Sequence, residues 1–216
     1  MRATIQTKTY LEPENVKLLP AGHIKIVTAF RELIKEKDFS TITWAEIARK
    51  AGVNEALIYK YFKDKRGLLH HAMAEGLKNF IAQLKLSLKD VDGALNKIKK
   101  LIWYHINSYN ENRIFAKIQM VEVIGCQEYF QSDAYKLAKE YGKIILKILE
   151  EGVKNSEIRN DIQLKSLRQL ILGAIELHCL PNVIFNREMS PDDITKDICE
   201  VLFSGMKKPN QINQIL

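Results

Sequence analysis

The chain has 216 residues, of which 46% are apolar and 27% charged, as in soluble globular proteins with a sizeable core. Glycine (10 residues) and proline (5 residues) are too scarce for a turn-rich all-β fold. The first twenty residues lack the apolar segment of a signal peptide, and the apolar run 170–185 is too short and too polar to span a bilayer. We therefore expect a cytoplasmic protein that does not enter membranes.

The net charge of +7 is unevenly distributed along the chain. Residues 22–90 hold 13 Lys/Arg against 8 Asp/Glu, whereas residues 91–216 hold 17 against 16. A basic segment joined to a nearly neutral one is typical of a polyanion-binding module attached to a second domain. Solvated helical faces often carry as much charge, so the pattern supports this interpretation only together with a motif.

From residue 22 onward the apolar residues recur at helical spacing almost to the end. The predicted helices are 22–37, 44–50, 55–62, 65–88, 93–110, 114–125, 132–154, 164–185 and 191–206. The sequence thus predicts an all-α fold of about nine helices. Residues 1–21 lack a strong period and contain two prolines, so we expect an N-terminal arm there.

The segment 43–62, TWAEIARKAGVNEALIYKYF, carries the most specific local pattern. Thr43 and Glu46 form a capping box at the start of one short helix, and Gly52 suits a left-handed turn after it. Asn54 is a competent N-cap for a second short helix. Two short helices over a tight turn indicate a helix-turn-helix, whose second helix enters the major groove of DNA. A plain helical hairpin uses similar residues.

Residues 23–73 resemble the DNA-binding domain of the tetracycline-repressor (TetR) family over about 50 contiguous positions. The matching features are Thr43, the run Ile-Ala-x-x-Ala-Gly-Val at 47–53, the aliphatic-Tyr-x-aromatic-Phe run ending at Phe62, and Lys65 three residues later. Asp38 stands where the family usually has the glycine that ends the first helix, and we expect Asp38 to adopt a left-handed conformation. The resemblance implies a three-helix DNA-binding domain followed by a helical bundle.

Matched position by position, the resemblance also implies DNA contacts. Thr43, Tyr59 and Lys65 take the places of phosphate-contacting residues. Asn54 begins the recognition helix, whose base-facing surface is expected to hold Glu55, Ala56, Leu57 and Lys60. Glu55 has an alternative role, which is to complement the helix dipole.

An aromatic-rich stretch follows in the region where the family encloses its effector. Together with a buried-looking Glu176, it gives the predicted ligand-binding set Trp103, Tyr104, Tyr109, Phe115, Met120, Tyr129 and Phe130. At helical spacing such a set is often ordinary core, and both interpretations stay open. A glutamate among apolar neighbours needs a partner. Glu176 is therefore either an interface residue or the polar group of a pocket.

The last two helices occupy the position of the family's dimerisation pair. Small and apolar residues on them form the predicted dimer interface: Leu170, Gly173, Ala174, Leu177, Ile194, Ile198, Val201 and Leu202. Pairing both helices with their symmetry mates makes a four-helix interface, which suits a homodimer.

Two other kinds of site are not expected. Cys126, Cys179 and Cys199 form no CxxC or Cys/His cluster and are expected to pack as small apolar residues in a reducing compartment. The rings of adjacent His70 and His71 point about 100° apart on a helix, so no metal site is predicted there. No cofactor is expected, and no catalytic motif is present.

The sequence as a whole predicts a homodimeric DNA-binding transcription regulator, a repressor released by a small apolar or aromatic effector. Residues 22–68 are expected to bind an operator in double-stranded DNA, and residues 69–216 to bind the effector and dimerise. One alternative is a regulator of the same fold controlled by a protein partner or by no ligand. Another is a cytoplasmic enzyme built on a helical bundle, which the confined basic charge and the short recognition helix disfavour.

Overall fold

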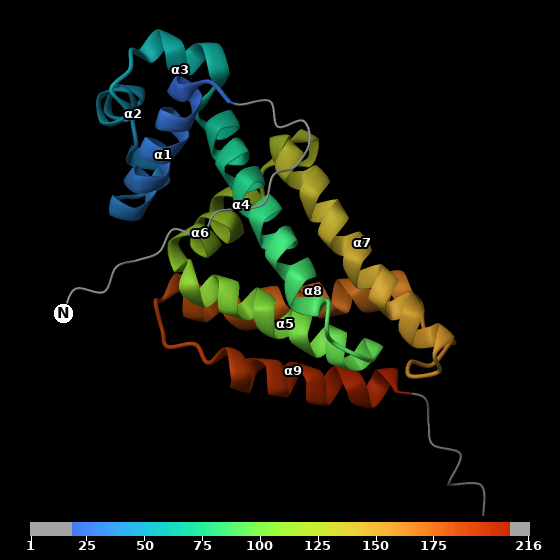
Figure 1. The fold of residues 1–216 in the computed structure, drawn as a ribbon. Coiled ribbons are helices and arrows are strands. Elements are labelled where there is room, and N and C mark those ends of the chain that lie inside the picture. Colours follow the sequence, from blue (N-terminus) through green and yellow to red (C-terminus); the bar gives the residue numbers. More distant parts are fainter. Residues whose placement is uncertain (1–18, 208–216) are drawn as a thin grey trace, which may run out of the picture.

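The computed structural model describes residues 19–207, and within this range the fold is all-α with nine α-helices (Figure 1). In chain order these are α1 (Ala21–Glu36), α2 (Trp44–Ala51), α3 (Glu55–Tyr61), α4 (Lys65–Leu88), α5 (Ala94–Glu111), α6 (Arg113–Ile118), α7 (Asp133–Lys154), α8 (Leu164–Ile184) and α9 (Pro191–Met206). The predicted all-α fold is confirmed. Most of the predicted N-terminal arm lies outside the described residues.

Side-chain caps set several of the helix starts. Thr43 and Glu46 form the predicted capping box of α2, with the Thr43 amide donating to Glu46 Oε2 at 2.9 Å and the Glu46 amide donating to Thr43 Oγ1 at 3.3 Å. Asn54 caps α3, and Ser190 caps α9 with Pro191 in its first turn. Because these caps satisfy amides that have no partner within the helix, they fix where each helix begins.

The end of α1 differs from the prediction. Asp38 has φ −63° and an extended conformation, so the expected left-handed residue is absent there. Lys37 ends the helix in an extended conformation, and Asp38 then precedes the short 3-10 helix η1 (Phe39–Thr41). The Thr41 hydroxyl donates to the Asp38 carbonyl at 2.8 Å, which gives that carbonyl a local partner without a left-handed turn.

The predicted helix 114–125 is also interrupted. The α-helix α6 ends at Ile118 and continues as the π-helical segment η2 (Gln119–Val123), in which the Ile124 amide donates to the Gln119 carbonyl at 3.1 Å. A 3-10 helix, η3 (Gln127–Gln131), then leads into α7. Single-turn π segments inside helices often mark functional sites.

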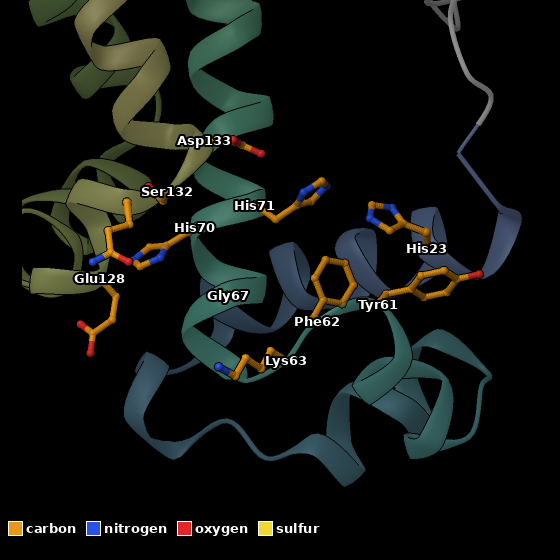
Figure 2. Close-up of a pocket in the computed structure, with 11 residues that line it drawn as sticks. His23, Tyr61, Phe62, Lys63, Gly67, His70, His71, Glu128, Ser132 and Asp133 are labelled. Atoms are coloured by element: carbon orange, nitrogen blue, oxygen red, sulfur yellow. The ribbon is translucent and has the colours of Figure 1, made fainter.

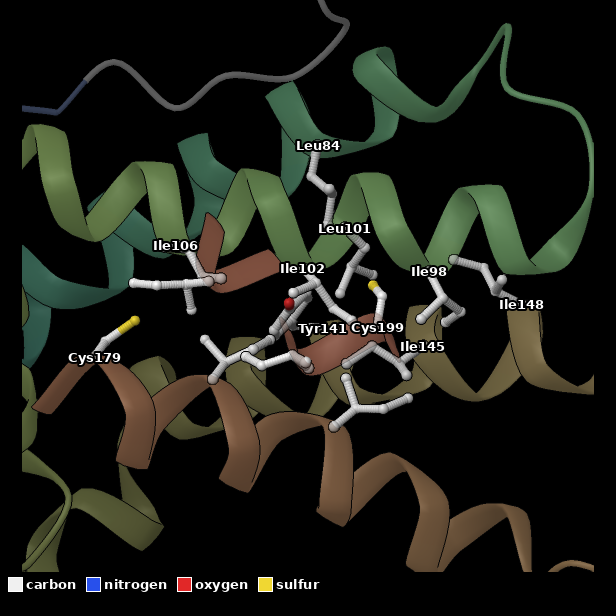
Figure 3. Close-up of a cluster of buried hydrophobic side chains, with 14 of the residues drawn as sticks. Leu84, Ile98, Leu101, Ile102, Ile106, Tyr141, Ile145, Ile148, Cys179 and Cys199 are labelled. Carbon is white, nitrogen blue, oxygen red and sulfur yellow. The ribbon is translucent and has the colours of Figure 1, made fainter. Parts of the chain in front are cut away.

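Two apolar cores stabilise the molecule, and α4 contributes to both. Its first half carries Leu68, Leu69 and Ala72 into a core shared with α1, α2 and α3. Its second half carries Ile81 and Leu84 into a core shared with α5, α7, α8 and α9, part of which Figure 3 shows. Figure 1 shows α4 running from the three short helices into the bundle. The helix α4 therefore joins the two halves.

The bundle holds together through close helix contacts. α7 packs on α4, and α9 packs along α5 (Figure 1). At the end of α7, Gly152 lies against Ala94 and Ile158, so closely that a Cβ at Gly152 would stand 2.8 Å from Ala94 Cβ. Within residues 19–207, every helix is too short or too polar to cross a membrane.

Candidate functional site

The first candidate site is the α2–turn–α3 unit. Gly52 ends α2 with φ 64°, the left-handed conformation that the turn requires. Ile47 and Ile58 are fully buried, one from each helix, and hold the two helices across the turn. Hydrogen bonds from Lys37 and Thr43 lower the pKa of Glu46 to about 2, so the capping carboxylate stays charged over the physiological range. The unit is thus a rigid platform for the outer face of α3.

That outer face carries most of the predicted base-facing residues. Glu55, Ala56 and Lys60 are exposed, whereas Asn54 uses its Oδ1 to accept from the Leu57 amide at 2.8 Å. Leu57 was predicted on this face, but the structure places it elsewhere. Its side chain packs over the first turn of α1, where Leu57 Cδ2 lies 2.8 Å from the position that a Cβ on Gly22 would take. Leu57 therefore serves mainly to position α3 on α1.

Tyr59 stands beside the start of α2. Its side chain is 54% exposed, and its ring lies 5.3 Å from the ring of half-buried Trp44. Trp44 directly follows Thr43, so the Tyr59 ring lies close to the start of α2. Helix N-termini and hydroxyl groups are common phosphate ligands. The contact of Trp44 with Tyr59 was not predicted, although an aromatic at the first position of a short helix is an available signal.

Lys65 differs from its predicted role. Its Nζ donates to three backbone carbonyls around η1, those of Phe39 (3.0 Å), Ser40 (3.1 Å) and Ile42 (2.9 Å). An ammonium group has three protons, so this arrangement leaves none for a phosphate. Burial lowers the pKa of Lys65. In this structure the residue ties the loop between α1 and α2 to the start of α4, and we withdraw it as a phosphate contact.

The second candidate site is a polar network inside the bundle. The Tyr109 hydroxyl donates to Glu176 Oε1 at 2.5 Å and accepts from Gln119 Nε2 at 3.1 Å. His105 lies 4.0 Å from the same carboxylate oxygen, and its Nδ1 is hydrogen-bonded to the Tyr141 hydroxyl at 3.1 Å. Four elements, α5, η2, α7 and α8, thereby converge on the half-buried Glu176 carboxyl group, whose side chain is 27% exposed.

Burial dominates the electrostatics of this network. It raises the pKa of Glu176, with the Tyr109 hydrogen bond opposing the shift, and it raises the pKa values of Tyr109 and Tyr141. It also lowers the pKa of His105 to about 4, so His105 is neutral at physiological pH. Within residues 19–207, no lysine or arginine nitrogen lies within 4.0 Å of the Glu176 carboxylate. The network is thus able to exchange hydrogen bonds with a neutral polar group.

The predicted aromatic set does not gather at one place. Tyr104 packs on Phe80, and Met120 lies against the bundle core near the network. Phe115 and Tyr129 pack instead on the core of the N-terminal half. Two members are peripheral: Trp103 donates from Nε1 to Asp192 at 2.8 Å on the α5–α9 side, and Phe130 is 54% exposed. Helical period places aromatics on a face without specifying which neighbour covers that face.

The residues of the predicted dimer interface on α8 and α9 also differ in their exposure. Leu170 (61%), Leu177 (71%) and Val201 (76%) are exposed, and nothing lies within 4 Å of a Cβ built on Gly173. Ala174 and Leu202 are half-buried. Ile194 and Ile198 are each 6% exposed and belong to the core of the bundle. Because α9 turns these two side chains toward its own protomer, we remove them from the predicted interface.

Cysteine placement agrees with the prediction except at Cys126. Cys179 and Cys199 are buried among apolar residues, and burial raises the pKa of the first to about 12 and of the second to about 11. Cys126 is half-exposed, and its Sγ lies 2.6 Å from Glu128 Oε2. All three thiols are free. In the part of the chain that the structure describes, no three His, Cys, Asp or Glu residues are placed to share a metal ion.

Two family models match consecutive parts of the chain. Residues 26–72 match the family model described as bacterial regulatory proteins, tetR family, and residues 73–205 match that of the YsiA-like protein C-terminal region. The chain belongs to the tetR family of bacterial regulatory proteins. It is therefore a DNA-binding transcriptional regulator, and the functional prediction made from residues 43–65 is confirmed at that level. The family is one of regulators, which favours this reading over the helical-bundle enzyme.

Individual members of the tetR family resemble the chain over nearly its whole length. The fatty acid metabolism regulator protein of Bacillus subtilis (strain 168) is 25% identical over 184 residues, covering 85% of this chain and 95% of the relative. The crystal structure of FadR from Bacillus subtilis in complex with stearoyl-CoA superimposes with a TM-score of 0.76 at 26% identity, covering 85% and 98%. FadR from Bacillus halodurans shares the fold, with a TM-score of 0.75 at 20% identity.

Three members of the interior network were missed from the sequence of this tetR-family chain: His105, Gln119 and Tyr141. Each lies on an otherwise apolar helical face, and that is the available signal. A single polar residue at a core position is ambiguous, because many such residues are satisfied within the core. Here the members of the network come from four different elements, a convergence that no local pattern reveals.

Proposed function

We propose that this tetR-family regulator is a homodimeric repressor whose operator complex is released by a long-chain acyl-CoA. The observation that carries the proposal is the whole-length likeness to the Bacillus subtilis FadR structure that contains stearoyl-CoA. The likeness extends through the bundle, the half of the chain that binds the effector in this proposal. The proposed boundary between operator-binding residues 22–68 and the remaining residues falls within α4.

The interior of the bundle suits an acyl chain with one polar end. The core between α4, α5, α7 and α8 is packed with aliphatic side chains such as Ile98, Ile102 and Ile145, all fully buried, so an acyl chain would enter by displacing them. Each buried CH₂ group contributes about 0.8 kcal/mol. Burial raises the pKa of Glu176, and a protonated carboxyl at this position is able to accept from Tyr109 and donate to a carbonyl oxygen. We assign the thioester carbonyl to this position, with Tyr104 and Met120 beside it.

The operator-binding part of the proposal uses the exposed edge of α2 and α3. Thr43 and Tyr59 contact phosphates, and Glu55, Ala56 and Lys60 face the bases. Two copies of this edge must stand about 34–36 Å apart for adjacent major-groove half-sites. The exposed apolar residues Leu170, Leu177 and Val201 form the proposed dimer interface, together with Gly173, Ala174 and Leu202, and thereby set that spacing.

Operator binding with added effector tests the proposal. After selection of bound sequences from random DNA, operator affinity is measured by fluorescence anisotropy with stearoyl-CoA, octanoyl-CoA, coenzyme A and stearate. We expect stearoyl-CoA to weaken the operator complex by about 5–150-fold, the usual range of allosteric coupling. It should also raise the melting temperature of the free protein. Coenzyme A alone should do neither.

A variant pair tests the assigned polar end. Glu176→Gln should raise the stearoyl-CoA concentration needed for half-release by about 3–30-fold, because an amide offers a weaker donor to the thioester carbonyl. Glu188→Gln changes an exposed carboxylate beyond α8 and should leave that concentration unchanged. If no acyl-CoA changes operator affinity or melting temperature, the effector assignment is wrong, and control by a protein partner or by no ligand becomes the better hypothesis.

A further inference from the structure

Three of the five histidines of the chain gather where the operator-binding half meets the bundle. His23 comes from the first turn of α1, and His70 and His71 come from the second turn of α4. They line a cavity of about 390 Å³, across which lie Glu128 of η3 and Asp133 at the start of α7 (Figure 2). Neither the acyl-CoA proposal nor the operator contacts use this cluster.

His23 holds three helices together. Its ring lies 4.9 Å from Phe62 and 5.4 Å from Tyr61, both at the end of the recognition helix, and 4.6 Å from His71 on α4. The residue is 7% exposed. Its Nδ1 is buried and has no hydrogen-bond partner among residues 19–207. A proton on this ring would place a charge in the middle of the packing that orients α3.

The charged groups around His23 would not fully neutralise a positive charge on its ring. On α4, His71 Nε2 lies 3.4 Å from Glu75 Oε1, and Glu75 already forms an ion pair with Arg31 of α1 at 3.2 Å. Lys63, after α3, and Asp133 of α7 face the group from across the cavity. Burial lowers the pKa of His23 and proximity to His71 lowers it further, while Glu75 acts in the opposite direction.

His70 makes the corresponding contact on the bundle side of α4. Its ring lies 6.2 Å from Tyr129 of η3, and its buried Nε2 has no partner within the described range. Burial lowers the pKa of His70, as does Arg66 one turn earlier on α4. Asp64 and Glu128 act in the opposite direction. Protonation here would introduce a charge between α4 and the segment that leads into α7.

We propose that His23 and His70 form a pH-sensitive latch, whose neutral state holds α3 and α4 in the operator-binding arrangement and whose protonation weakens operator binding without any effector. The sign follows from linkage. In the packed arrangement both rings bind a proton less readily than exposed histidines. This arrangement is therefore most favoured above the ordinary histidine pKa of 6.5, and it loses stability relative to arrangements that expose the rings as the pH falls below that value. The proposal rests on DNA binding alone and is independent of the acyl-CoA assignment.

The latch is tested by measuring operator affinity from pH 8.0 to 5.5, at constant ionic strength and without acyl-CoA. For the full chain we expect the operator Kd to rise by at least about threefold between pH 7.5 and 5.5, within the limit of tenfold per pH unit for each linked proton. In the double variant His23→Gln/His70→Gln, the rise in operator Kd over the same pH range should be smaller by about threefold or more. His178→Asn, which removes an exposed histidine on α8, should keep the wild-type profile.

The variants must remain folded for this comparison, so their melting temperatures are measured at pH 7.5. Where the double glutamine variant melts below the assay temperature, His23→Phe/His70→Phe replaces it, because phenylalanine suits the aromatic surroundings and cannot titrate. A wild-type profile that is flat or that shows tighter binding at low pH would overturn the proposal. So would a double variant as steep as wild type, or a His178→Asn profile as flat as that of the double variant.

Discussion

Lys65 shows how a single side chain can take a structural role in a position that suggests a binding one. Its ammonium group donates to the carbonyls of Phe39, Ser40 and Ile42 and lies 4.7 Å above the Phe39 ring. These contacts close the loop that presents Thr43 and the start of α2. We therefore expect Lys65 to affect DNA binding indirectly, by positioning Thr43 and the start of α2.

Substitution of Lys65 distinguishes a structural role of this residue from a role as a phosphate contact. Lys65→Met leaves three carbonyls without their donor, and we expect a loss of about 1–2 kcal/mol in the free energy of unfolding, or roughly 2–8 °C in melting temperature. Lys60→Ala removes an exposed lysine on α3 and should leave the melting temperature unchanged. Because Lys60 faces the bases in the proposal, Lys60→Ala should weaken binding to the operator more than binding to unrelated DNA. A Lys65→Met protein with wild-type stability and a flatter salt dependence would restore the phosphate role.

At the scale of the helices, local sequence signals were sufficient for most boundaries. Residues 65–88 and 191–206 were predicted with the observed ends, and most other ends differ by one residue. Caps such as Asn54 and Ser190 act within one helical turn, so the helix starts that they set can be predicted from the sequence. The exception is 114–125, where the π-helical segment and η3 replace one continuous helix. Here Gln119 reaches Tyr109 on α5, a partner outside the local sequence.

Contacts between helices are tested by a glycine substitution. In Gly152→Ala, the new Cβ would lie 2.6 Å from Ile158 Cδ1 and 2.8 Å from Ala94 Cβ, which forces α5 and α7 apart. We expect a loss of about 1–2 kcal/mol in the free energy of unfolding, since the overpacking exceeds the gain in helix propensity. In the matched control Gly76→Ala, the nearest atom is Phe115 Cε1 at 4.0 Å, and stability should rise by up to about 1 kcal/mol. Urea denaturation of both variants checks the pair, and equal effects would contradict the packing argument.

At the scale of the whole molecule, the exposed apolar face of α8 is the basis for proposing a dimer. Leu177→Asp places a charge at the centre of that face, where Leu177 is 71% exposed. Sedimentation velocity should show a shift toward monomer, and operator affinity should fall because two half-sites are no longer tethered. Leu86→Asp, at a leucine on α4 that is 64% exposed, should remain dimeric. A Leu177→Asp protein that stays a dimer at micromolar concentration would place the interface elsewhere.

The amino-acid sequence by itself determined the all-α class, the positions of the helices and the helix-turn-helix, because capping and periodicity act over a few residues. The same signals located the outward face of α3, where Glu55, Ala56 and Lys60 are exposed. They did not determine that Leu57 covers Gly22, that Ile198 turns into its own bundle, or which aromatic residues surround Glu176. Those outcomes depend on side chains far apart in the chain.

The tertiary structure decided which helix covers each apolar face and thereby which polar groups meet. The Glu176 network draws on four elements, and the histidine cluster joins α1 to α4 beside the start of α7. Periodicity specifies that a residue points inward but carries no information about the partner it finds there. The burial that shifts the protonation of Glu176, His23 and His70 arises only when distant segments pack together and exclude water from them.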